Sequence, residues 1–241
     1  EPLSPGHTFA TYGDLDSAKA AIVKGKTAAV FVEPVQGEGG VFPADETFLK
    51  GLRTLCDETG AVLVFDEVQC GLGRTGYLWG HQSVNVEPDI MTVAKPLAGG
   101  LPIGAVLMTE TVANAMSPGD HGSTFAGGPL VCHAANAVYD KVNTPVFMAN
   151  VVARGEQLRD GLREALKSDA RVVEVRGSGL LVGVQLNVPA GPLVGICRDL
   201  GLLVITAGAG DVLRLLPPLV VSESEVDKAV AIIAEAMGKM E

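Results

Sequence analysis

Basic residues are scarce in this chain. Its 241 residues include 18 Lys and Arg against 28 Asp and Glu, so the formal net charge is −10. A protein that binds nucleic acid needs a basic footprint on its surface, and we therefore predict no nucleic-acid partner. The acidic residues are dispersed along the sequence, which argues against an acidic interaction tail.

Long apolar runs are also missing. Two uncharged stretches, 177–197 and 121–139, are interrupted by proline, glycine and polar residues. A transmembrane helix requires about 20 consecutive and mostly apolar residues. We therefore predict a soluble protein without a membrane partner.

Cysteine and histidine are too few and too scattered for a local metal site. The four cysteines show neither a short metal-ligand spacing nor the density of a disulfide framework, so we interpret them as reduced thiols of an intracellular protein. The chain begins with Glu1 rather than methionine, and no targeting segment can be recognised. We expect a processed protein or a part of a longer one.

Strand-length apolar runs alternate with helical periodicities in the first part of the chain. Helices are expected over 14–22, 46–59 and 129–142, and strands over 28–32, 61–65, 90–93 and 104–108. Strands that are apolar throughout and separated by helices predict a parallel sheet that is covered on both faces. This part of the chain is therefore expected to be an α/β domain.

The pattern changes around 143–149. A longer helix should follow, with apolar residues at helical spacing from Val151 to Leu162. The rest should contain short strands over 172–175, 180–186, 202–205 and 212–216 and a last helix that opens with the capping box Ser222–Glu225. We place a domain boundary near residue 147, which leaves 1–146 as a portion of a large α/β domain and 147–241 as a smaller C-terminal α+β domain.

Two chemically reactive side chains end neighbouring apolar runs. Asp66 follows the run 61–65, where a carboxylate could be a helix cap, a loop residue or a ligand-binding group. A lysine is ordinarily a solvated surface residue, but Lys95 has no other charged residue within five positions on either side, which weakens that interpretation; a desolvated lysine would be a usable amine nucleophile. Ligands of parallel sheets bind beyond the carboxyl ends of the strands. A carboxylate and a lysine there could hold a pyridine ring by its nitrogen and its aldehyde carbon, as pyridoxal phosphate chemistry requires.

Other polar residues could contribute to the same site. Gln69 could reach a further ring substituent, whereas Glu67 is expected to face away. Ser123 and Thr124 offer hydroxyl groups to a phosphate, or they belong to an ordinary polar loop. Arg214 stands alone in an apolar run and needs an anion, which could be an internal carboxylate or a substrate carboxylate.

Two glycine-rich segments need an interpretation. Residues 37–40, Gly-Glu-Gly-Gly, follow an expected strand and predict a tight turn. Residues 71–76 match the G-x-G-x-x-G pattern of dinucleotide-binding proteins, but no helix is expected after them and no acidic residue lies about 20 positions further on. We interpret the second match as incidental.

Together these segments resemble the class III pyridoxal-phosphate-dependent aminotransferases along essentially the whole chain. The motifs behind this resemblance are Glu-Pro-Val-Gln-Gly-Glu-Gly-Gly at 33–40, Phe-Asp-Glu-Val-Gln at 65–69, Gly-Leu-Gly-Arg-Thr-Gly at 71–76 and Ala-Lys at 94–95. Within the class, the chain is most similar to the acetylornithine-converting members, particularly those of plants, over 90–107, 120–132 and 202–221.

The resemblance implies fold type I and a homodimer whose active sites lie at the subunit interface, with pyridoxal 5'-phosphate as the cofactor. Lys95 would form the Schiff base with the cofactor and shuttle the proton of transamination. Asp66 would keep the ring nitrogen protonated, and Gln69 would approach the ring hydroxyl. Ser123 and Thr124 would reach the cofactor phosphate of the neighbouring subunit.

The resemblance also implies how one site accepts two kinds of substrate. Arg214 would bind the α-carboxylate of glutamate or 2-oxoglutarate, and Glu38 would pair with Arg214 while a terminal-amino donor is bound. The implied reaction converts N-acetylornithine and 2-oxoglutarate to N-acetylglutamate 5-semialdehyde and glutamate, in arginine biosynthesis. An ornithine or 4-aminobutyrate aminotransferase of the same class and a truncated, non-catalytic polypeptide are the alternatives.

Members of this class have an N-terminal part that supplies a phosphate-binding turn, a stacking aromatic residue and a further substrate arginine. This chain does not contain those segments, so we expect it to be a C-terminal portion with weak cofactor retention and little turnover by itself. The plant-type resemblance implies a mitochondrion or a chloroplast as the location, and the cytoplasm is expected otherwise.

Overall fold

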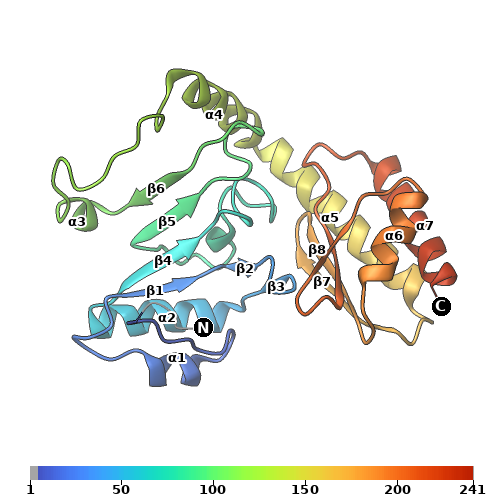
Figure 1. Ribbon diagram of the computed structural model, residues 1–241, viewed down its shortest axis with the longest axis horizontal. Helices are drawn as coiled ribbons and strands as arrows, with labels where there is room; N and C mark the ends of the chain where they lie inside the picture. The colour runs from blue at the N-terminus through green and yellow to red at the C-terminus, as the bar shows by residue number, and fades with distance from the viewer. Residues whose placement is uncertain (1–4, 241) are drawn as a thin grey trace.

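The computed structural model describes residues 5–240, in which the chain forms two separate four-stranded sheets (Figure 1). The first sheet contains, in spatial order, β1 (Ala29–Val32), β4 (Val62–Asp66), β5 (Ile90–Val93) and β6 (Ala105–Met108). The second sheet contains β7 (Val172–Ser178), β8 (Leu181–Leu186), β10 (Val212–Leu215) and β9 (Ile205–Ala207).

The first sheet is parallel only in part. β1, β4 and β5 run parallel to one another, but β6 pairs with β5 in the antiparallel direction. The prediction of a parallel sheet is therefore wrong for this edge strand. A parallel neighbour needs a crossover of about a dozen residues or more, usually a helix, whereas residues 94–104 form turns without a helix.

Helices surround the first sheet unevenly. In chain order they are α1 (Leu15–Ala21), α2 (Glu46–Thr59), the short 3-10 helix η1 (Gly80–Ser83), α3 (Glu110–Ala113) and α4 (Pro129–Val142). Asp45 caps the start of α2, and Gly60 ends it with a φ of 78°, as the sequence predicts. Leu63 and Phe65 of β4 are fully buried against α2 on this face.

In the described residues, the opposite face of the first sheet is open at its two edge strands, although Val64 on the central strand β4 is buried. Phe31 of β1 is 74% exposed and Val106 of β6 is 56% exposed. The prediction that both faces are covered is wrong for residues 5–240, because α1 and α2 both pack on the other face. The predicted helix α4 forms, but Leu130 on its expected buried side is 74% exposed.

The second sheet is antiparallel throughout and has its own core. It is covered by α5 (Pro145–Leu166), α6 (Gly191–Asp199) and α7 (Glu223–Lys239). Leu158 and Leu162 of α5 lie with Leu213 of β10 in one buried cluster. The predicted capping box at Ser222 and Glu225 opens α7.

Two elements of this second part differ from the predictions. The strand expected over 202–205 lies at Ile205–Ala207 instead. The sequence pattern also does not predict α6, because glycines at 191 and 195 weaken the helical periodicity. Its Pro192 is tolerated because it lies in the first turn, where the missing N–H has no intrahelical partner.

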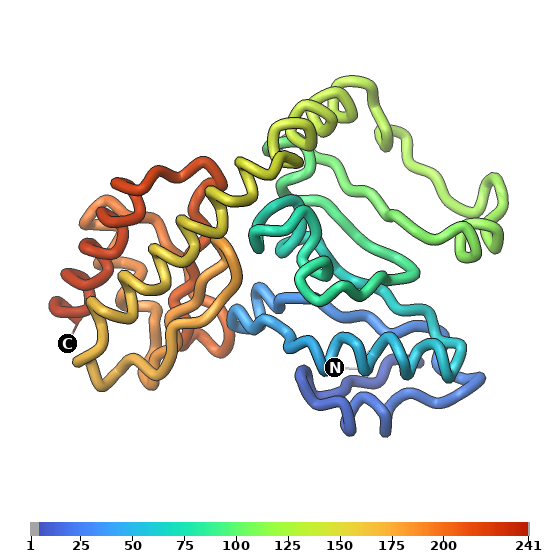
Figure 2. Tube along the Cα trace, turned by 180° about the vertical axis from the view of Figure 1, so that it is seen from behind, coloured from blue at the N-terminus to red at the C-terminus, as the bar shows by residue number. Residues whose placement is uncertain are grey.

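The long helix α5 begins earlier than expected. Thr144 caps it by accepting a hydrogen bond from the N–H of Phe147, and Pro145 occupies the first turn. The segment 143–149 is therefore largely helical, and residue 147, near the expected domain boundary, lies inside the first turn. Figures 1 and 2 both show α5 continuing from the end of α4 toward the second sheet.

A short hairpin lies between the two sheets. Its strands are β2 (Val35–Gln36) and β3 (Phe42–Pro43), and the predicted glycine-rich turn joins them. Val35 and Val41 of this segment form a buried cluster with Cys70 and with Leu181 of β8. The hairpin thus packs against both halves of the molecule.

None of the helices within residues 5–240 combines the length and apolar character needed to cross a bilayer. Across the same residues, no group of His, Cys, Asp and Glu side chains is arranged to hold a metal ion. The polar side chains that converge between the two sheets form the candidate site.

Candidate active site

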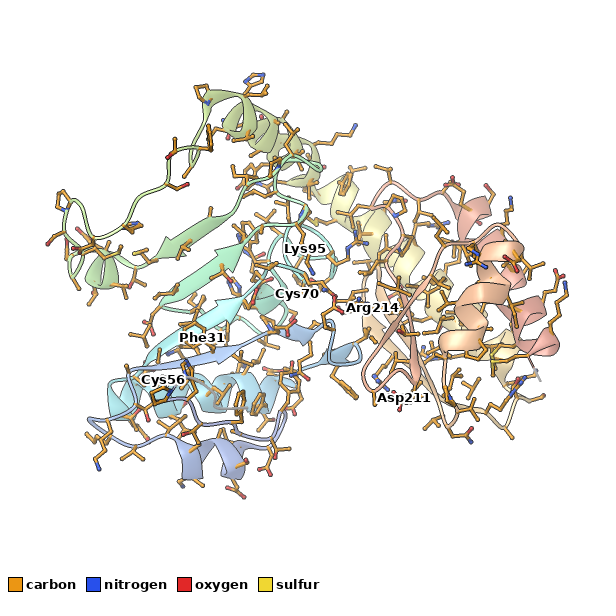
Figure 3. The ribbon with its side chains drawn as sticks, viewed as in Figure 1. Phe31, Cys56, Cys70, Lys95, Asp211 and Arg214 are labelled. Atoms are coloured by element: carbon orange, nitrogen blue, oxygen red, sulfur yellow. The ribbon has the colours of Figure 1, made fainter. Side chains whose placement is uncertain are left out.

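The parallel strands of the first sheet end at the side that faces the second sheet. β4 ends at Asp66, and β5 ends at Val93, two residues before Lys95. In Figure 3, Lys95 and Arg214 lie in the region between the two sheets. Asp66 and Lys95 thus follow two neighbouring strands at the same carboxyl edge, as the sequence predicts for a ligand site.

Asp66 is half-buried, and one of its carboxylate oxygens is fixed by two hydrogen bonds. Oδ1 accepts from the backbone N–H of Val68 at 2.9 Å and from the hydroxyl of Thr92 at 3.1 Å. Thr92 is the register partner of Asp66 on β5, so the sheet itself orients the side chain. Oδ2 has no hydrogen-bond donor among the described residues and is free to accept one from a ligand.

Lys95 is exposed in this chain, which contradicts the expectation of a desolvated lysine. The physical reason is that Lys95 lies in a turn beyond the end of β5, outside the sheet; Val138 of α4 approaches the same turn at Gly99. Its charge still acts on the carboxylates nearby. Burial raises the pKa of Glu33, and the Lys95 ammonium is one of the groups that oppose this rise.

Glu38, Gln69 and Arg214 form a hydrogen-bonded group across the gap between the sheets. Nη1 of Arg214 lies 2.7 Å from Oε1 of Glu38, and Nη2 lies 2.9 Å from Oε2. Gln69 accepts from the same Nη1 at 2.9 Å and donates to Glu38 Oε1 at 3.2 Å. The hydrogen bonds from Arg214 lower the pKa of Glu38 below its ordinary value. The anion that Arg214 requires is thus, in this structure, an internal carboxylate.

The two partners of this ion pair differ in solvent exposure. The Arg214 side chain is 4% exposed, whereas the Glu38 side chain is 71% exposed. Arg214 extends from the interior strand β10, and Glu38 lies in the turn between β2 and β3. The buried cation is therefore stationary, and its carboxylate partner has room to move.

Gly37 leaves the space in which the Gln69 amide lies. A Cβ atom added at residue 37 would lie 1.9 Å from Oε1 of Gln69. The glycine of the predicted turn therefore admits the side chain that joins Glu38 to Arg214.

Ser123 and Thr124 are not brought to this group. Both are exposed and belong to the segment that joins α3 to α4. In Figure 1 this segment runs outside β6, on the side away from the second sheet. Within the described chain, no hydrogen bond links either hydroxyl to Lys95 or Asp66.

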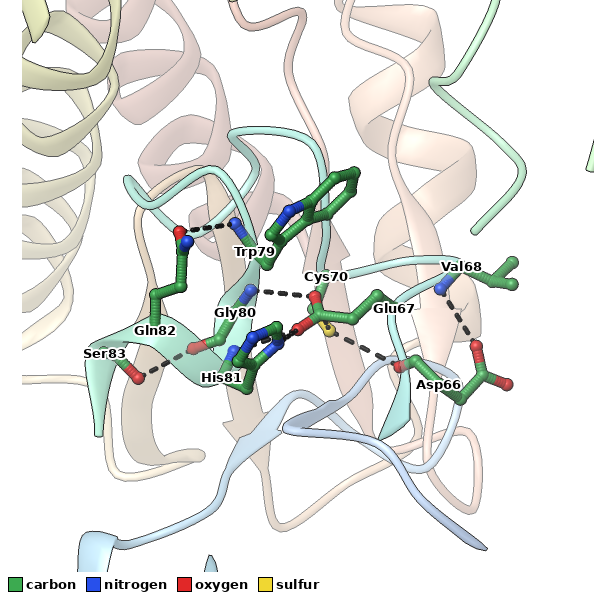
Figure 4. Close-up of polar contacts among 9 residues, drawn as sticks. All are labelled: Asp66, Glu67, Val68, Cys70, Trp79, Gly80, His81, Gln82 and Ser83. Carbon is green, nitrogen blue, oxygen red and sulfur yellow. Dashed lines mark hydrogen bonds and ion pairs between the residues drawn. The ribbon is translucent and has the colours of Figure 1, made fainter. Parts of the chain in front are cut away.

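The sequence patterns give no indication of a buried network behind Asp66 (Figure 4). Glu67 is 1% exposed and faces away from Asp66, as expected. Its carboxylate accepts from the backbone N–H groups of Gly80 at 2.8 Å and His81 at 2.9 Å, and it lies 2.8 Å from Nδ1 of His81. The Cys70 thiol also contacts it at 3.2 Å. The Glu67 carboxylate therefore connects the start of the loop that carries Gln69 to η1 at Gly80 and His81.

The glycine-rich segment 71–76 also has a structural use that the sequence interpretation missed. Arg74 donates to the carbonyl oxygens of Leu180 at 3.1 Å and Pro217 at 2.6 Å. Leu180 donates in return to the Arg74 carbonyl at 2.9 Å. Burial lowers the pKa of Arg74 to about 10, so it stays charged at neutral pH. The segment therefore joins the two sheets, and the element that follows it is the short 3-10 helix η1 rather than the α-helix of a dinucleotide-binding unit.

The residues at the strand ends fit a pyridoxal group. The free Oδ2 of Asp66 can accept from a protonated ring nitrogen, and the exposed amine of Lys95 can condense with an aldehyde. Arg214 opposite them can bind a carboxylate if Glu38 leaves. The donor set thus suits an amino acid held next to such a ring.

Comparison with known proteins gives the same family. A sequence model of the class-III aminotransferases matches residues 11–237. Acetylornithine aminotransferase, mitochondrial, of Alnus glutinosa is 56% identical over 237 residues, which are 98% of this chain and 52% of that protein. The chain therefore spans about half the length of this relative.

Solved structures of aminotransferases share the fold. The N-acetylornithine aminotransferase of Stenotrophomonas maltophilia K279a is 38% identical, with a TM-score of 0.86 over 95% of this chain and 61% of that one. The ornithine aminotransferase of Toxoplasma gondii ME49 is 33% identical, with a TM-score of 0.93 over 99% of this chain and 58% of that one. The predicted α/β fold of type I is confirmed.

Proposed function

Because the chain belongs to the class-III aminotransferases, we propose that it serves the transfer of an amino group from N-acetylornithine to 2-oxoglutarate, which gives N-acetylglutamate 5-semialdehyde and glutamate. The observation that supports this best is the placement of Lys95 and Asp66 at the ends of adjacent parallel strands, opposite Arg214. The likeness to proteins named acetylornithine aminotransferase supports the substrate.

Each residue has a proposed task. When bound, pyridoxal 5'-phosphate supplies an electron-withdrawing ring that stabilises negative charge on the substrate carbon. Lys95 holds the cofactor covalently through Nζ and, once released, moves the proton at the substrate carbon. Asp66 would hold the ring nitrogen through Oδ2, and Gln69 would hold the ring hydroxyl.

Substrate exchange depends on the pair of Glu38 and Arg214. Glutamate and 2-oxoglutarate carry an α-carboxylate that can replace Glu38 on Arg214 in the same bidentate manner. A donor that reacts through a terminal amine leaves Glu38 in place. Because the Glu38 side chain is 71% exposed, it can leave Arg214 without unpacking the core.

The active unit is proposed to be a homodimer with shared sites. Ser123 and Thr124 lie on an exposed segment beside Phe125, which is 89% exposed, and Leu130, which is 74% exposed. A second copy that covers this surface would bring the two hydroxyls to the cofactor phosphate of its neighbour. Sedimentation velocity tests this, and a monomer at micromolar concentration in the presence of the cofactor would contradict it.

We further propose a division into 1–146 and 147–241 and a mitochondrial or chloroplast location. The separate cores of the two sheets support the division. The name of the Alnus glutinosa relative includes the word mitochondrial, which supports the location. Residues 1–4 and 241 lie outside the described residues.

The visible absorbance of the protein with added pyridoxal 5'-phosphate tests the site. A band should appear that is lost in Lys95→Ala and retained in Lys24→Ala, since Lys24 is an exposed lysine in a loop of the same chain. Borohydride reduction followed by peptide mass mapping should locate the cofactor on Lys95. A band that survives in Lys95→Ala would refute the assignment.

Single-turnover reactions then test the substrate. N-acetylornithine should discharge the band, and 2-oxoglutarate should restore it. Faster discharge by ornithine or 4-aminobutyrate would favour an aminotransferase of the same class for that donor. A Lys95-dependent band that no donor discharges would favour the non-catalytic polypeptide.

A further inference from the structure

The turn that carries Glu38 is under backbone strain. Val41 is fully buried and has a φ of 58°, in the left-handed region that β-branched residues avoid. Gly40, just before it, has a φ of 125°. Such conformations persist only where the surrounding structure imposes them, so the groups that hold this turn decide where Glu38 lies.

One of these groups is the guanidinium of Arg176, which extends from β7 of the second sheet. Its Nε donates to the carbonyl oxygens of Gly40 at 3.1 Å and Val41 at 3.0 Å, and Nη2 donates to Gly40 as well. The guanidinium lies 3.8 Å from the ring centroid of Phe42. Arg176 thus contacts both the backbone carbonyl groups of the turn and the aromatic ring that follows them.

Arg176 is itself fixed by the second sheet. It is 8% exposed, and Nη1 bonds to Glu174 at 3.0 Å while Nη2 bonds to Gln185 of β8 at 2.9 Å. A planar guanidinium can serve all these acceptors at once, which a lysine ammonium cannot. The turn is therefore tied to the same sheet that carries Arg214.

Two more bonds hold the backbone on either side of the Glu38 side chain. The carbonyl of Glu38 accepts from the N–H of Gly208 at 2.9 Å, in the turn after β9. The N–H of Gly37 donates to Oε2 of Glu33 at 3.0 Å. The main chain around Glu38 is anchored on both sides, whereas among residues 5–240 its side chain is bound only by Arg214 and Gln69.

We infer that Arg176 is a positioning residue that keeps the main chain of the Glu38 turn in place, so that only the Glu38 side chain moves when Arg214 exchanges partners. The consequence of this positioning for catalysis rests on the proposed function. Without Arg176, the strained turn can relax, and Glu38 no longer returns to the same position over Arg214. Arg214 would then stay open to α-carboxylates and would discriminate poorly in favour of the terminal-amino donor.

Carboxyl NMR of Glu38 in the chain without cofactor tests the positioning directly. The Arg214→Gln variant gives the Glu38 pKa without its partner, and Arg176→Gln should move the pKa toward that value. Arg171→Gln is the matched control, because Arg171 bonds to Asp169 and to the carbonyls of Met237 and Met240 but not to the turn. Circular dichroism and the melting curve verify that each variant is folded.

A Glu38 pKa in folded Arg176→Gln equal to that of the unsubstituted chain would overturn the inference. If Arg176→Gln does not fold, Arg176→Lys keeps the charge but loses the fork of donors, and the same comparison applies to it. A pKa between the two references supports the positioning role, and an unchanged pKa overturns it.

Kinetics test the catalytic meaning separately. In Arg176→Gln, KM for N-acetylornithine should rise by about tenfold, the loss expected for one charge-assisted hydrogen bond, while KM for glutamate should not rise. Equal increases in both would overturn the link to specificity. If the unsubstituted protein has no activity, the proposed function fails, but the NMR comparison still decides whether Arg176 positions Glu38.

Discussion

Replacement of Glu67 by alanine should destabilise the protein strongly, although Glu67 is not expected to touch substrate. The carboxylate is 1% exposed and accepts from two backbone N–H groups, those of Gly80 and His81. A buried donor that loses its acceptor costs about 1–3 kcal/mol. The imidazole of His81 and the thiol of Cys70 lose a partner as well. We therefore expect the free energy of unfolding to fall by about 3–5 kcal/mol, the range for breaking a buried charged network.

The assay combines urea unfolding with hydrogen exchange. Because two separate cores need not unfold together, exchange at the Gly80 and His81 amides reports the local effect. Both should lose protection in Glu67→Ala. Glu67→Gln retains one acceptor oxygen and should lose less. The control is Glu58→Ala, an exposed carboxylate on α2, which should change the free energy of unfolding by no more than about 0.5 kcal/mol.

The reasoning would be refuted by a loss below about 1 kcal/mol in Glu67→Ala, together with unchanged protection of the two amides. That result would mean that water or a rearranged loop satisfies the donors. A large loss of stability with full protection at Gly80 and His81 would also refute it, since the damage would then lie elsewhere.

Other predictions concern the turn, the ion pair and the thiols. Gly37→Ala should push the Gln69 amide off Arg214, because the new Cβ would lie 1.9 Å from it, and the side-chain amide resonances of Gln69 should shift; unchanged resonances would contradict this. Arg214 lowers the pKa of Glu38 from 4.5, so the stability from this pair should be complete above pH 4.5 and be lost as the pH falls through the lowered pKa; a carboxyl titration with its midpoint at or above 4.5 would disprove it. Cys132 is half-buried while the other three cysteines are buried, so one thiol should react with a thiol reagent in the native protein and all four after denaturation.

Local sequence patterns predict those helices whose first and last positions carry typical capping residues. Asp45 and Gly60 mark the ends of α2, and Ser222 marks the start of α7, as expected. The direction of β6 is not available from its apolar pattern, because it depends on the length of the connection from β5. The sequence pattern does not predict the helix α6, because its glycines weaken the helical periodicity. Packing on the second sheet nevertheless stabilises this helix.

The residue pattern predicts Asp66 and Lys95 as a pair, whereas the pairing of Glu38 with Arg214 is expected from the family resemblance alone and is observed. The lone charges Asp66 and Lys95 stand out because their neighbours are apolar, and the order of strands brings them to one edge. The partner of Arg214 does not follow from such a pattern. Glu38 lies 176 positions away, and only the packing of the hairpin on the second sheet brings the two together. Glu67 and Arg176 are missed for the same reason, since their partners are backbone groups that any residue supplies.

The difference in burial between Arg214 and Glu38 determines which substrates can displace the Glu38 side chain. A cation that is 4% exposed cannot be left without an anion except at a high cost in free energy. Glu38 can therefore leave only if another carboxylate takes its place. Because Arg214 extends from a strand, and the turn that carries Glu38 is held by Gly208 at Glu38 and by Arg176 at Gly40 and Val41, neither partner can follow the other away. A substrate whose reacting amino or keto group adjoins a carboxylate displaces the Glu38 side chain, and one that reacts through an amine remote from its carboxylate meets a neutralised arginine.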